Sequence, residues 1–566
     1  MVLRLCWSCS RSPTSPGRPC GGTVCYEVVM IGDQPQTVPA LLLAAAREFG
    51  SNLALVDGAT RCDFAALADA SLCVSAALAE YGVRPGDRVG IWAPNSSEWV
   101  VAALGAACAG AVLVPVNTRA KGEEAAELLR RARCRLLFTT RGFLGADYPE
   151  MLLESGVDLS IIERTVLLSG DVGTNELSWA ALIAVAGSRR HVASVDADDI
   201  SHVQFTSGTT GRPKGAMLRH RALCGTTRDW VTNVGLVAGD RYCIVSPLFH
   251  VSGHKTGVLA CLTAGATMYP QATFDPVAVM ETVQRERITV LPGPPTIYQT
   301  LLAHPRRVEF DLTSLRLAVT GAASIPPVLV EQMMSELGFR EVITAYGITE
   351  TTGVVTMCRP GDEVTLIAES SGRAVDSVEV RIVTPDGDEA PSGATGEILV
   401  RGYNVMAGYL DDDAATQAAV DAEGWFHSGD VGWVDDRGNL RITDRLGDVF
   451  IVGGFNAYPA EIEAVMTRHA GIAQVAVIGE PDERLGEVGC AFVVRRLGGN
   501  ADALLTETVL LDWCRERLAN YKVPRRAIFV DALPQNASGK VLKHELRALG
   551  ARVGLFSNRN EPGDAP

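Results

Sequence analysis

The order of hydrophobic and polar positions divides the chain into alternating strand-like and helix-like segments. Short apolar runs such as "DRVGIW", "SHVQF" and "LRLAVTG" have the length and composition of buried strands. Between such runs, "FAALADASLCVSAALAEYG" and "DPVAVMETVQRER" repeat apolar residues at helical spacing. This alternation predicts an α/β fold with largely parallel sheets.

The pattern changes after about residue 375, where short strands and turns such as "VEVRIVTPDGD" and "GEILVRG" follow one another. After "GDVFIVGG" a small α/β pattern returns and ends near residue 548. We therefore predict a large N-terminal domain, residues 30–445, made of parallel α/β sheets plus a β-rich subdomain. A small α/β C-terminal domain is predicted over residues 446–550.

Neither end of the chain has the apolar periodicity that is typical of a packed core. Residues 1–29 are rich in Ser, Pro, Gly and Arg, and we predict a disordered extension, or translation that begins at Met30. Cysteines 6 and 9 form a C-x2-C pair that suggests zinc, but the next pair is C-x4-C and no second ligand-rich region follows. Residues 551–566 are predicted to be a disordered tail.

Composition excludes some classes of function. A formal net charge of −15 over 566 residues argues against general nucleic-acid binding, which favours a basic face. The uncharged run from Trp99 to Thr118 has nearly the length of a membrane span, but Gly105, Gly110 and Pro115 interrupt it. We predict a buried helix followed by a buried strand there. Ten cysteines beyond the first 25 residues lie in apolar segments, which suits a reducing cytoplasm.

The segment "TSGTTGRPKG", residues 206–215, has almost nothing that could pack in a core. Its glycines allow successive backbone N–H groups to converge on an anion, and Lys214 adds a positive charge. The spacing differs from that of a Walker A loop, because the two loop glycines and the lysine are three residues apart. The chemistry nevertheless predicts a polyphosphate site.

Four further segments occur in a fixed order: "TAYGITE", "GWFHSGD", "DRLGDVFIVGGFNAYPAEIE" and "LPQNASGKVLKHEL". Together with the phosphate loop they resemble the adenylate-forming superfamily of acyl-CoA synthetases, peptide-synthetase adenylation domains and luciferases, over about residues 35–548. The run "FDPVAVMETVQRERITVLPGPPTIYQTLL" is similar to CoA ligases of bacterial steroid-ring catabolism. The resemblance implies a reaction in two halves. A carboxylate attacks the α-phosphorus of ATP to give acyl-adenylate and pyrophosphate, and the CoA thiol then displaces AMP.

The resemblance also implies the nucleotide site. The loop should hold the β- and γ-phosphates, Thr349 should contact the α-phosphate, and Glu350 should bind Mg²⁺. Tyr346 should stack on adenine, Asp430 should accept hydrogen bonds from the ribose hydroxyls, and Arg445 should approach ribose and phosphate. Lys540 should bridge the carboxylate and the α-phosphate during adenylation. The remaining expected nucleotide contacts come from the loop and from "TGAAS": Thr206, Ser207, Gly208, Thr209, Thr210, Gly211, Lys214, Ala322 and Ala323.

For the acid, the resemblance places His250 of "PLFHVSGH" as a gate, with a core histidine as the competing interpretation. Gly453, Gly454 and Phe455 should line the CoA tunnel. The family's hinge is at Gly447, where relatives usually have Lys or Asp, and the C-terminal domain is expected to be mobile about it. The other candidate acyl-pocket residues are Phe249, Gly253, His254, Thr296, Tyr298 and Gly321.

Two alternatives remain open at this point. A free-standing adenylation enzyme could load a carrier protein, although the segment "PLFHVSGHK" lacks the Asp that commonly binds a substrate amine in such enzymes. A non-catalytic scaffold could keep the fold, but the presence of Lys214, Glu350, Asp430, Arg445 and Lys540 together argues against it. The expected partners are thus ATP, CoA and a carboxylic acid, with no nucleic acid and no membrane span; a homodimer is an open option.

Overall fold

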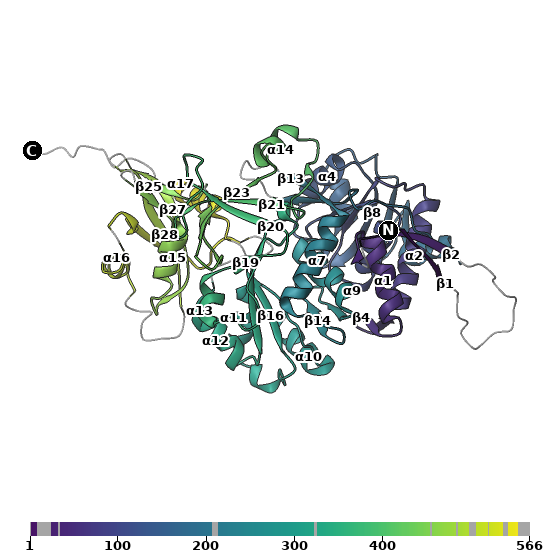
Figure 1. The fold of residues 1–566 in the computed structure, drawn as a ribbon, viewed down its shortest axis with the longest axis horizontal. Helices are drawn as coiled ribbons and strands as arrows, with labels where there is room; N and C mark the ends of the chain where they lie inside the picture. Colours follow the sequence, from purple (N-terminus) through teal and green to yellow (C-terminus); the bar gives the residue numbers. More distant parts are fainter. Residues whose placement is uncertain are drawn as a thin grey trace, which may run out of the picture.

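The computed structural model describes residues 2–7, 24–31, 34–206, 213–321, 325–445, 447–452, 455–482, 485–496, 505–518, 520–535 and 541–552. It has a mixed α/β fold with a large N-terminal and a small C-terminal part. Figure 1 shows the small part, with α15, α16 and β25 to β28, at one end of the long axis, and α1 and α2 towards the other.

The largest sheet has nine strands in the order β11-β10-β8-β6-β7-β12-β13-β22, with β9 beside β8. Neighbours from β11 to β12 are parallel, and β13 and β22 add an antiparallel edge. The strands are β6 (Arg88–Trp92), β7 (Val112–Pro115), β8 (Cys134–Phe143), β9 (Ala146–Asp147), β10 (Arg164–Ser169), β11 (Glu176–Ser178), β12 (Ile200–Thr206), β13 (Lys214–Arg219) and β22 (Gly408–Tyr409). The helices that precede or connect these strands in the chain are α2 (Phe64–Glu80), α3 (Ser97–Cys108), α4 (Gly122–Arg131), α5 (Tyr148–Glu154) and α6 (Trp179–Ala186).

Two four-stranded sheets follow, ordered β14-β15-β4-β5 and β16-β17-β18-β19. Their strands are β4 (Leu53–Asp57), β5 (Thr60–Asp63), β14 (Arg241–Ile244), β15 (Thr267–Pro270), β16 (Leu317–Gly321), β17 (Glu341–Tyr346), β18 (Thr356–Met357) and β19 (Arg373–Ala374). Their helices are α1 (Val38–Phe49), α7 (His220–Val234), α8 (Val251–Gly253), α9 (Ala260–Ala264), α10 (Pro276–Glu286), α11 (Pro295–Ala303), α12 (Pro327–Ser335) and α13 (Val364–Glu369).

The segment "ITVLP", which the pattern predicts to be a strand, forms only single bridges. Val290 pairs with Tyr242 on one side and with Leu317 on the other, and so joins the two four-stranded sheets. Pro292, two residues after Val290, has no N–H to donate towards β14. On the other side the Leu291 and Gly293 N–H groups still donate to the carbonyls of Leu317 and Val319, so the expected strand is reduced to single bridges rather than lost.

The β-rich subdomain is an antiparallel sheet of β20 (Val378–Val383), β21 (Gly396–Gly402), β23 (Phe426–Val434) and β24 (Leu440–Arg445), with α14 (Asp413–Ala419) beside it. The small C-terminal part has a sheet ordered β26-β25-β28-β27, with β29 parallel to β28. Its elements are β25 (Phe450–Val452), β26 (Phe455–Ala457), α15 (Pro459–Met466), β27 (Ile472–Asp482), β28 (Gly486–Arg495), α16 (Glu507–Arg515), β29 (Arg526–Phe529) and α17 (Lys543–Arg552).

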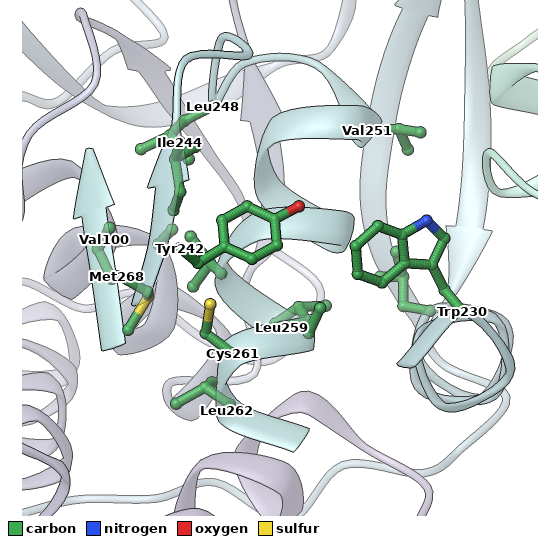
Figure 2. Packing of buried hydrophobic residues seen from close by; sticks show 14 of the residues in the cluster. Val100, Trp230, Tyr242, Ile244, Leu248, Val251, Leu259, Cys261, Leu262 and Met268 are labelled. Atoms are coloured by element: carbon green, nitrogen blue, oxygen red, sulfur yellow. The ribbon is translucent and has the colours of Figure 1, made fainter. Parts of the chain in front are cut away.

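The buried apolar side chains form separate cores in the two parts. The two clusters of the large part draw their buried members from Val38 to Leu440, and the two clusters of the small part draw theirs from Phe450 to Leu546. In the large core, Tyr242 is surrounded by side chains such as Leu259, Cys261 and Met268 (Figure 2). The predicted domain boundary at residues 445 and 446 lies between the last residue of one core and the first of the other.

The leading segment differs from the prediction of a disordered extension. β1 (Val2–Trp7) and β2 (Val24–Ile31) pair as antiparallel strands, and β3 (Gln34–Pro35) continues the sheet. Both strands are mostly apolar, VLRLCW and VCYEVVMI, but the Ser-, Pro-, Gly- and Arg-rich residues between them dominated the composition on which the prediction rested. Within the described residues, the uncharged run is helix α3 followed by strand β7, and no helix is long and apolar enough to cross a membrane.

Three buried histidines predict a loss of stability in mild acid. Burial lowers the pKa of His254 and of His220 to about 4, and burial together with the neighbouring His254 and His220 lowers that of His202 well below its usual value. In the unfolded chain each would titrate near pH 6.5, so unfolding takes up protons below that pH. The stability that these neutral histidines provide is therefore complete above about pH 6.5 and is lost as the pH falls towards 4.

We expect the free energy of unfolding of the large domain to fall by up to about 4 kcal/mol per pH unit below pH 6. Urea titrations between pH 7 and 5, followed by tryptophan fluorescence, measure this slope. His220→Asn is the matched variant, because Nδ1 of His220 accepts the Val38 N–H at 3.2 Å and an amide oxygen can do the same without titrating. It should reduce the slope by about one third, and an unchanged slope would contradict the assignment.

Candidate active site

The predicted phosphate loop connects two paired strands. Strand β12 ends at Thr206, strand β13 begins at Lys214, and these two residues are opposite each other in the ladder. Residues 207–212, which include the predicted contacts Ser207, Gly208, Thr209, Thr210 and Gly211, lie outside the described residues. The structure thus places the two ends of the loop at the edge of the large sheet, with Lys214 at its base.

Tyr409 joins the loop to the predicted metal ligand. Its hydroxyl donates to Oε1 of Glu350 at 3.0 Å, and the Thr206 hydroxyl donates to the same oxygen at 3.2 Å. The Nζ atom of Lys214 lies 5.1 Å from the centre of the Tyr409 ring, which is close enough for a cation–π interaction. Thr206 and Lys214, at the two ends of the loop, therefore meet the sequence-distant Glu350 around the Tyr409 side chain. Burial and the Glu350 carboxylate both raise the pKa of Tyr409, so its hydroxyl remains a donor.

Thr349 and Glu350 lie on a short 3₁₀ turn, Thr349–Thr351, that follows strand β17. A long-range backbone hydrogen bond stabilises the turn, because the Met406 N–H donates to the Glu350 carbonyl at 2.8 Å. It ends with Thr352 at φ 53° and Gly353 at φ 77°, so the chain reverses sharply through two left-handed residues. The Thr349 side chain is buried.

Tyr346 and Asp430 are joined directly. The Tyr346 hydroxyl donates to Oδ2 of Asp430 at 2.6 Å, and both side chains are buried. Asp430 on β23 is the cross-strand partner of Arg445 on β24, whose side chain is not among the described ones. The structure therefore brings together the three residues predicted to contact adenine, ribose and phosphate. The predicted adenine-lining residues Ala322 and Ala323 lie outside the described residues.

The predicted gate His250 caps the short helix α8. Its Nδ1 is within 2.7 Å of the Ser252 hydroxyl and 3.2 Å from the Ser252 backbone nitrogen, and burial lowers its pKa. Gly253 lies so close to the Pro247 carbonyl that an added Cβ would be 2.0 Å from that oxygen. His254 is buried, with Nδ1 3.0 Å from Nε2 of His202. Of these three candidates, His250 is the one with partial exposure.

The other acyl-pocket candidates are spread over several elements. Tyr298 is fully buried in the core, with its hydroxyl 2.9 Å from the Leu291 carbonyl. Gly321 ends β16, where a Cβ would be 2.6 Å from the Ala345 carbonyl oxygen, so the two strands require glycine there. Phe249 is buried. Thr296 on α11 lines an open surface pocket of about 460 Å³, to which Gln474 of the small domain also contributes.

The small-domain candidates are only partly described. Lys540 and the CoA-tunnel residues Gly453 and Gly454 lie outside the described residues, and for Phe455 the backbone in β26 is described. The loop that carries Lys540 is closed at its base by a bridge between Gln535 and Val541. At Gly447, Nη2 of Arg547 donates to the carbonyl oxygen at 3.3 Å.

The donor set around Glu350 suits one Mg²⁺ ion bound together with substrate phosphates. Mg²⁺ commonly takes one or two carboxylates and completes its shell with phosphates and water. Among the described residues, hydrogen bonds to the Glu350 carboxylate are made at Oε1, which leaves Oε2 for a cation. No group of three or more His, Cys, Asp or Glu side chains in the described part forms a protein-only metal cage.

Sequence reasoning did not identify Tyr409, which organises the site. Its signal is weak: "MAGYLDD" has neither the glycine pattern of a phosphate loop nor an acid–base pair. Tyr409 reaches the site because β22 is the strand that pairs with β13 at the sheet edge. That long-range pairing, with Ala216 opposite Tyr409, is not visible in any local pattern.

Comparison with known proteins shows the same two-part organisation. Residues 42–410 match the family described as AMP-binding enzyme, and residues 461–540 match the AMP-binding enzyme C-terminal domain. The chain is 49% identical over 524 residues to a 3-[(3aS,4S,7aS)-7a-methyl-1,5-dioxo-octahydro-1H-inden-4-yl]propanoyl:CoA ligase of Rhodococcus jostii, covering 91% of this chain and 99% of that protein. A ligase of the same name from Mycobacterium tuberculosis is 49% identical over 92% of this chain and 100% of its own length.

A feruloyl-CoA synthase of Amycolatopsis is 37% identical, over 87% of this chain and 94% of its own. Among solved structures, the anthranilate CoA ligase AuaEII in complex with anthranoyl-AMP superimposes with a TM-score of 0.84 at 28% identity, covering 92% of this chain and 98% of that one. The site geometry, the two family matches and the near full-length relatives agree with one another. The chain therefore belongs to the AMP-binding enzyme family, in the acyl-CoA ligase branch of the adenylate-forming enzymes.

Proposed function

We propose that this acyl-CoA ligase activates a propanoic acid carried on a fused-ring, steroid-derived body. The observation that carries the proposal is the 49% identity, over nearly the whole length, to two ligases named for the same bicyclic dioxo acid. Identity to the synthase named for ferulic acid is lower, at 37%. The reaction consumes ATP and CoA and releases AMP and pyrophosphate.

In the first half-reaction, the chain's main task is to position the carboxylate in line with the α-phosphorus and to neutralise the charge that develops there. We assign the β- and γ-phosphates to the loop between Thr206 and Lys214, and the α-phosphate to Thr349. Oε2 of Glu350 would bind Mg²⁺, which would supply positive charge to the phosphate oxygens. Lys540 would donate to both the carboxylate and the α-phosphate.

We assign the nucleoside to the pair formed by Tyr346 and Asp430. A buried carboxylate that accepts one hydrogen bond from a tyrosine hydroxyl still has lone pairs for a ribose diol. The Tyr346 ring would then lie beside adenine, and Arg445, opposite Asp430 on the next strand, would approach ribose and phosphate. In the second half-reaction, CoA would enter along residues 453–455 after rotation at Gly447.

A panel of acids tests the substrate class. The purified enzyme is incubated with ATP, Mg²⁺, CoA and one acid at a time: the bicyclic dioxo propanoic acid, ferulic acid, octanoic acid or anthranilic acid. Pyrophosphate release and the mass of the thioester are measured. We expect kcat/KM for the bicyclic acid to exceed the others by at least about tenfold. A higher value for any of the other three would overturn the proposal, and thioester on a carrier protein but not on CoA would favour the carrier-loading alternative.

A further inference from the structure

Residues 403–410, here called the bridging segment, follow strand β21 and contain strand β22. The second half of the bridging segment is bonded to strand β13, which begins at Lys214. The Leu410 N–H donates to the Gly215 carbonyl oxygen at 2.8 Å, and β22 pairs with β13 as an antiparallel ladder. This half of the segment is therefore fixed relative to the base of the predicted phosphate loop.

The first half of the bridging segment is bonded to the turn that carries Glu350. The Met406 N–H donates to the Glu350 carbonyl oxygen at 2.8 Å. Two residues earlier, the Asn404 carbonyl oxygen accepts a hydrogen bond from the Thr352 hydroxyl at 2.8 Å. The side-chain Nδ2 of Asn404 donates to the Val354 carbonyl oxygen, also at 2.8 Å. Three hydrogen bonds thus join this half of the segment to the turn and to the residue that follows it.

The contacts of Asn404 are made away from water. Asn404 and Thr352 are both fully buried, and Val354 is buried as well. Thr352 also has φ 53°, a left-handed conformation that is unfavourable for a β-branched residue and that persists only where its surroundings maintain it. A buried polar group that loses its partner costs about 1–3 kcal/mol. Loss of either contact would therefore favour a different shape of the turn.

The position of this turn matters because one metal ion has to reach two partners. In the proposed function, Mg²⁺ contacts Oε2 of Glu350 and also phosphate oxygens bound beside Lys214. Mg²⁺ requires a nearly ideal octahedral shell, with oxygens at about 2.0–2.1 Å, so it tolerates little error in the spacing of its ligands. Tyr409 of the bridging segment contacts both partners, with its hydroxyl 3.0 Å from Oε1 of Glu350 and its ring centre 5.1 Å from Nζ of Lys214. The spacing between the two partners therefore depends on this segment.

We propose that Asn404 is a positioning residue that determines the distance between the Glu350 carboxylate and the phosphate loop, and through it the affinity for Mg²⁺ in the ATP complex. This inference rests on the proposed function. Asn404 acts through the turn, because its hydrogen bonds go to Thr352 and Val354 and not to Glu350 itself. It fixes one half of the bridging segment, while pairing with β13 fixes the other half.

The test uses Asn404→Asp, which keeps the shape of the side chain but replaces the N–H donor by an acceptor oxygen. Asn175→Asp, at an exposed position, is the matched control. One readout is the Mg²⁺ concentration that gives half-maximal pyrophosphate release at fixed ATP, called the Mg²⁺ midpoint. The other is the affinity for ATP, measured by calorimetry with and without Mg²⁺ and without any acid.

We expect Asn404→Asp to raise the Mg²⁺ midpoint about tenfold, the effect of one unsatisfied buried group. It should also lose most of the ATP affinity that Mg²⁺ adds, whereas the affinity without Mg²⁺ should equal that of the wild type. The control should match the wild type in both readouts. A folded Asn404→Asp enzyme that loses activity equally at all Mg²⁺ concentrations, with an unchanged midpoint, would show a merely structural role and overturn the inference.

Thr352 provides a second test, which also applies if Asn404→Asp does not fold. Thr352→Val removes only the hydroxyl that donates to Asn404, and Thr352→Ser retains a hydroxyl. The valine variant should raise the Mg²⁺ midpoint and the serine variant should leave it close to the wild-type value. Equal midpoints in the two variants would contradict the role of this contact and overturn the inference.

Glu350→Gln distinguishes a failure of this inference from a failure of the proposed function. The acid in the kinetic assay is the one among the four panel acids that the wild type activates best, so the test does not depend on the bicyclic acid. An unchanged Mg²⁺ midpoint in Glu350→Gln would refute the proposed metal site and this inference with it. A shift in Glu350→Gln without a shift in Asn404→Asp would refute only the role of Asn404.

Discussion

Lys540→Ala should abolish pyrophosphate release from ATP and acid, while it still converts pre-made acyl-adenylate and CoA into thioester. The reason is that negative charge builds up at the α-phosphorus only in the first half-reaction, which is where the ammonium of Lys540 is proposed to act. Pyrophosphate release and thioester formation are measured separately, the second with synthetic acyl-adenylate. A loss of both activities in a folded variant would contradict the proposed division of roles.

Gly447→Pro should have the reverse effect. Proline fixes φ near −65° and restricts the preceding residue as well, so the proposed hinge should lock, with acyl-adenylate formed and thioester absent. Gly447→Ala is the matched control, because a Cβ at this position meets nothing within 4 Å and the glycine does not have a left-handed φ. Alanine should therefore leave both halves close to wild type. If Lys540→Ala and Gly447→Pro lose both halves equally while remaining folded, the hinge model is wrong for this chain.

Glu350→Gln should lower the rate of adenylation by roughly two orders of magnitude or more, the scale typical for loss of a preorganised electrostatic group. The amide keeps the shape of the carboxylate but lacks the charge that binds Mg²⁺. Acyl-adenylate formation is measured by pyrophosphate release over a range of Mg²⁺ concentrations. Unchanged kinetics at limiting Mg²⁺ would contradict the assignment of Glu350.

Tyr409→Phe tests whether the position of the Glu350 carboxylate matters in addition to its charge. It removes the 3.0 Å hydrogen bond to Oε1 and keeps both the carboxylate and the ring beneath Lys214. Loss of one hydrogen bond to a charged group corresponds to about a tenfold effect or somewhat more. We therefore expect a smaller loss than in Glu350→Gln, with the Mg²⁺ requirement preserved.

The sequence predicted the elements of the large domain well where one pattern dominated. Helix α2 and strands β6, β12 and β16 all appear at the expected segments, because their apolar spacing is unambiguous. The prediction of a full strand was wrong at "ITVLP", where Val290 makes only single bridges. It also missed the pairing of β1 with β2, although both strands are mostly apolar, because the Ser-, Pro-, Gly- and Arg-rich residues between them dominated the composition of the leading segment.

For the site, the sequence predicted which residues take part, but it did not predict which of them contact one another. Asp430 and Arg445 are separated by 15 positions but are direct cross-strand partners, which follows from the hairpin of β23 and β24. Tyr409 and Asn404 carry no local motif, and their positions depend on a sheet edge and on long-range hydrogen bonds to a turn. Such placements come from tertiary packing, which neither propensity nor spacing encodes.

The buried apolar cores of the two parts are separated between Leu440 and Phe450, and this separation determines which part a destabilising substitution affects. In the described part of the chain, no buried cluster has members on both sides of that interval. A cavity-forming substitution among the residues beyond Phe450 therefore weakens a core that the larger one does not share. The larger domain of such a variant should stay folded after the small one has unfolded, so a measurement of folded large domain would overstate the amount of complete enzyme.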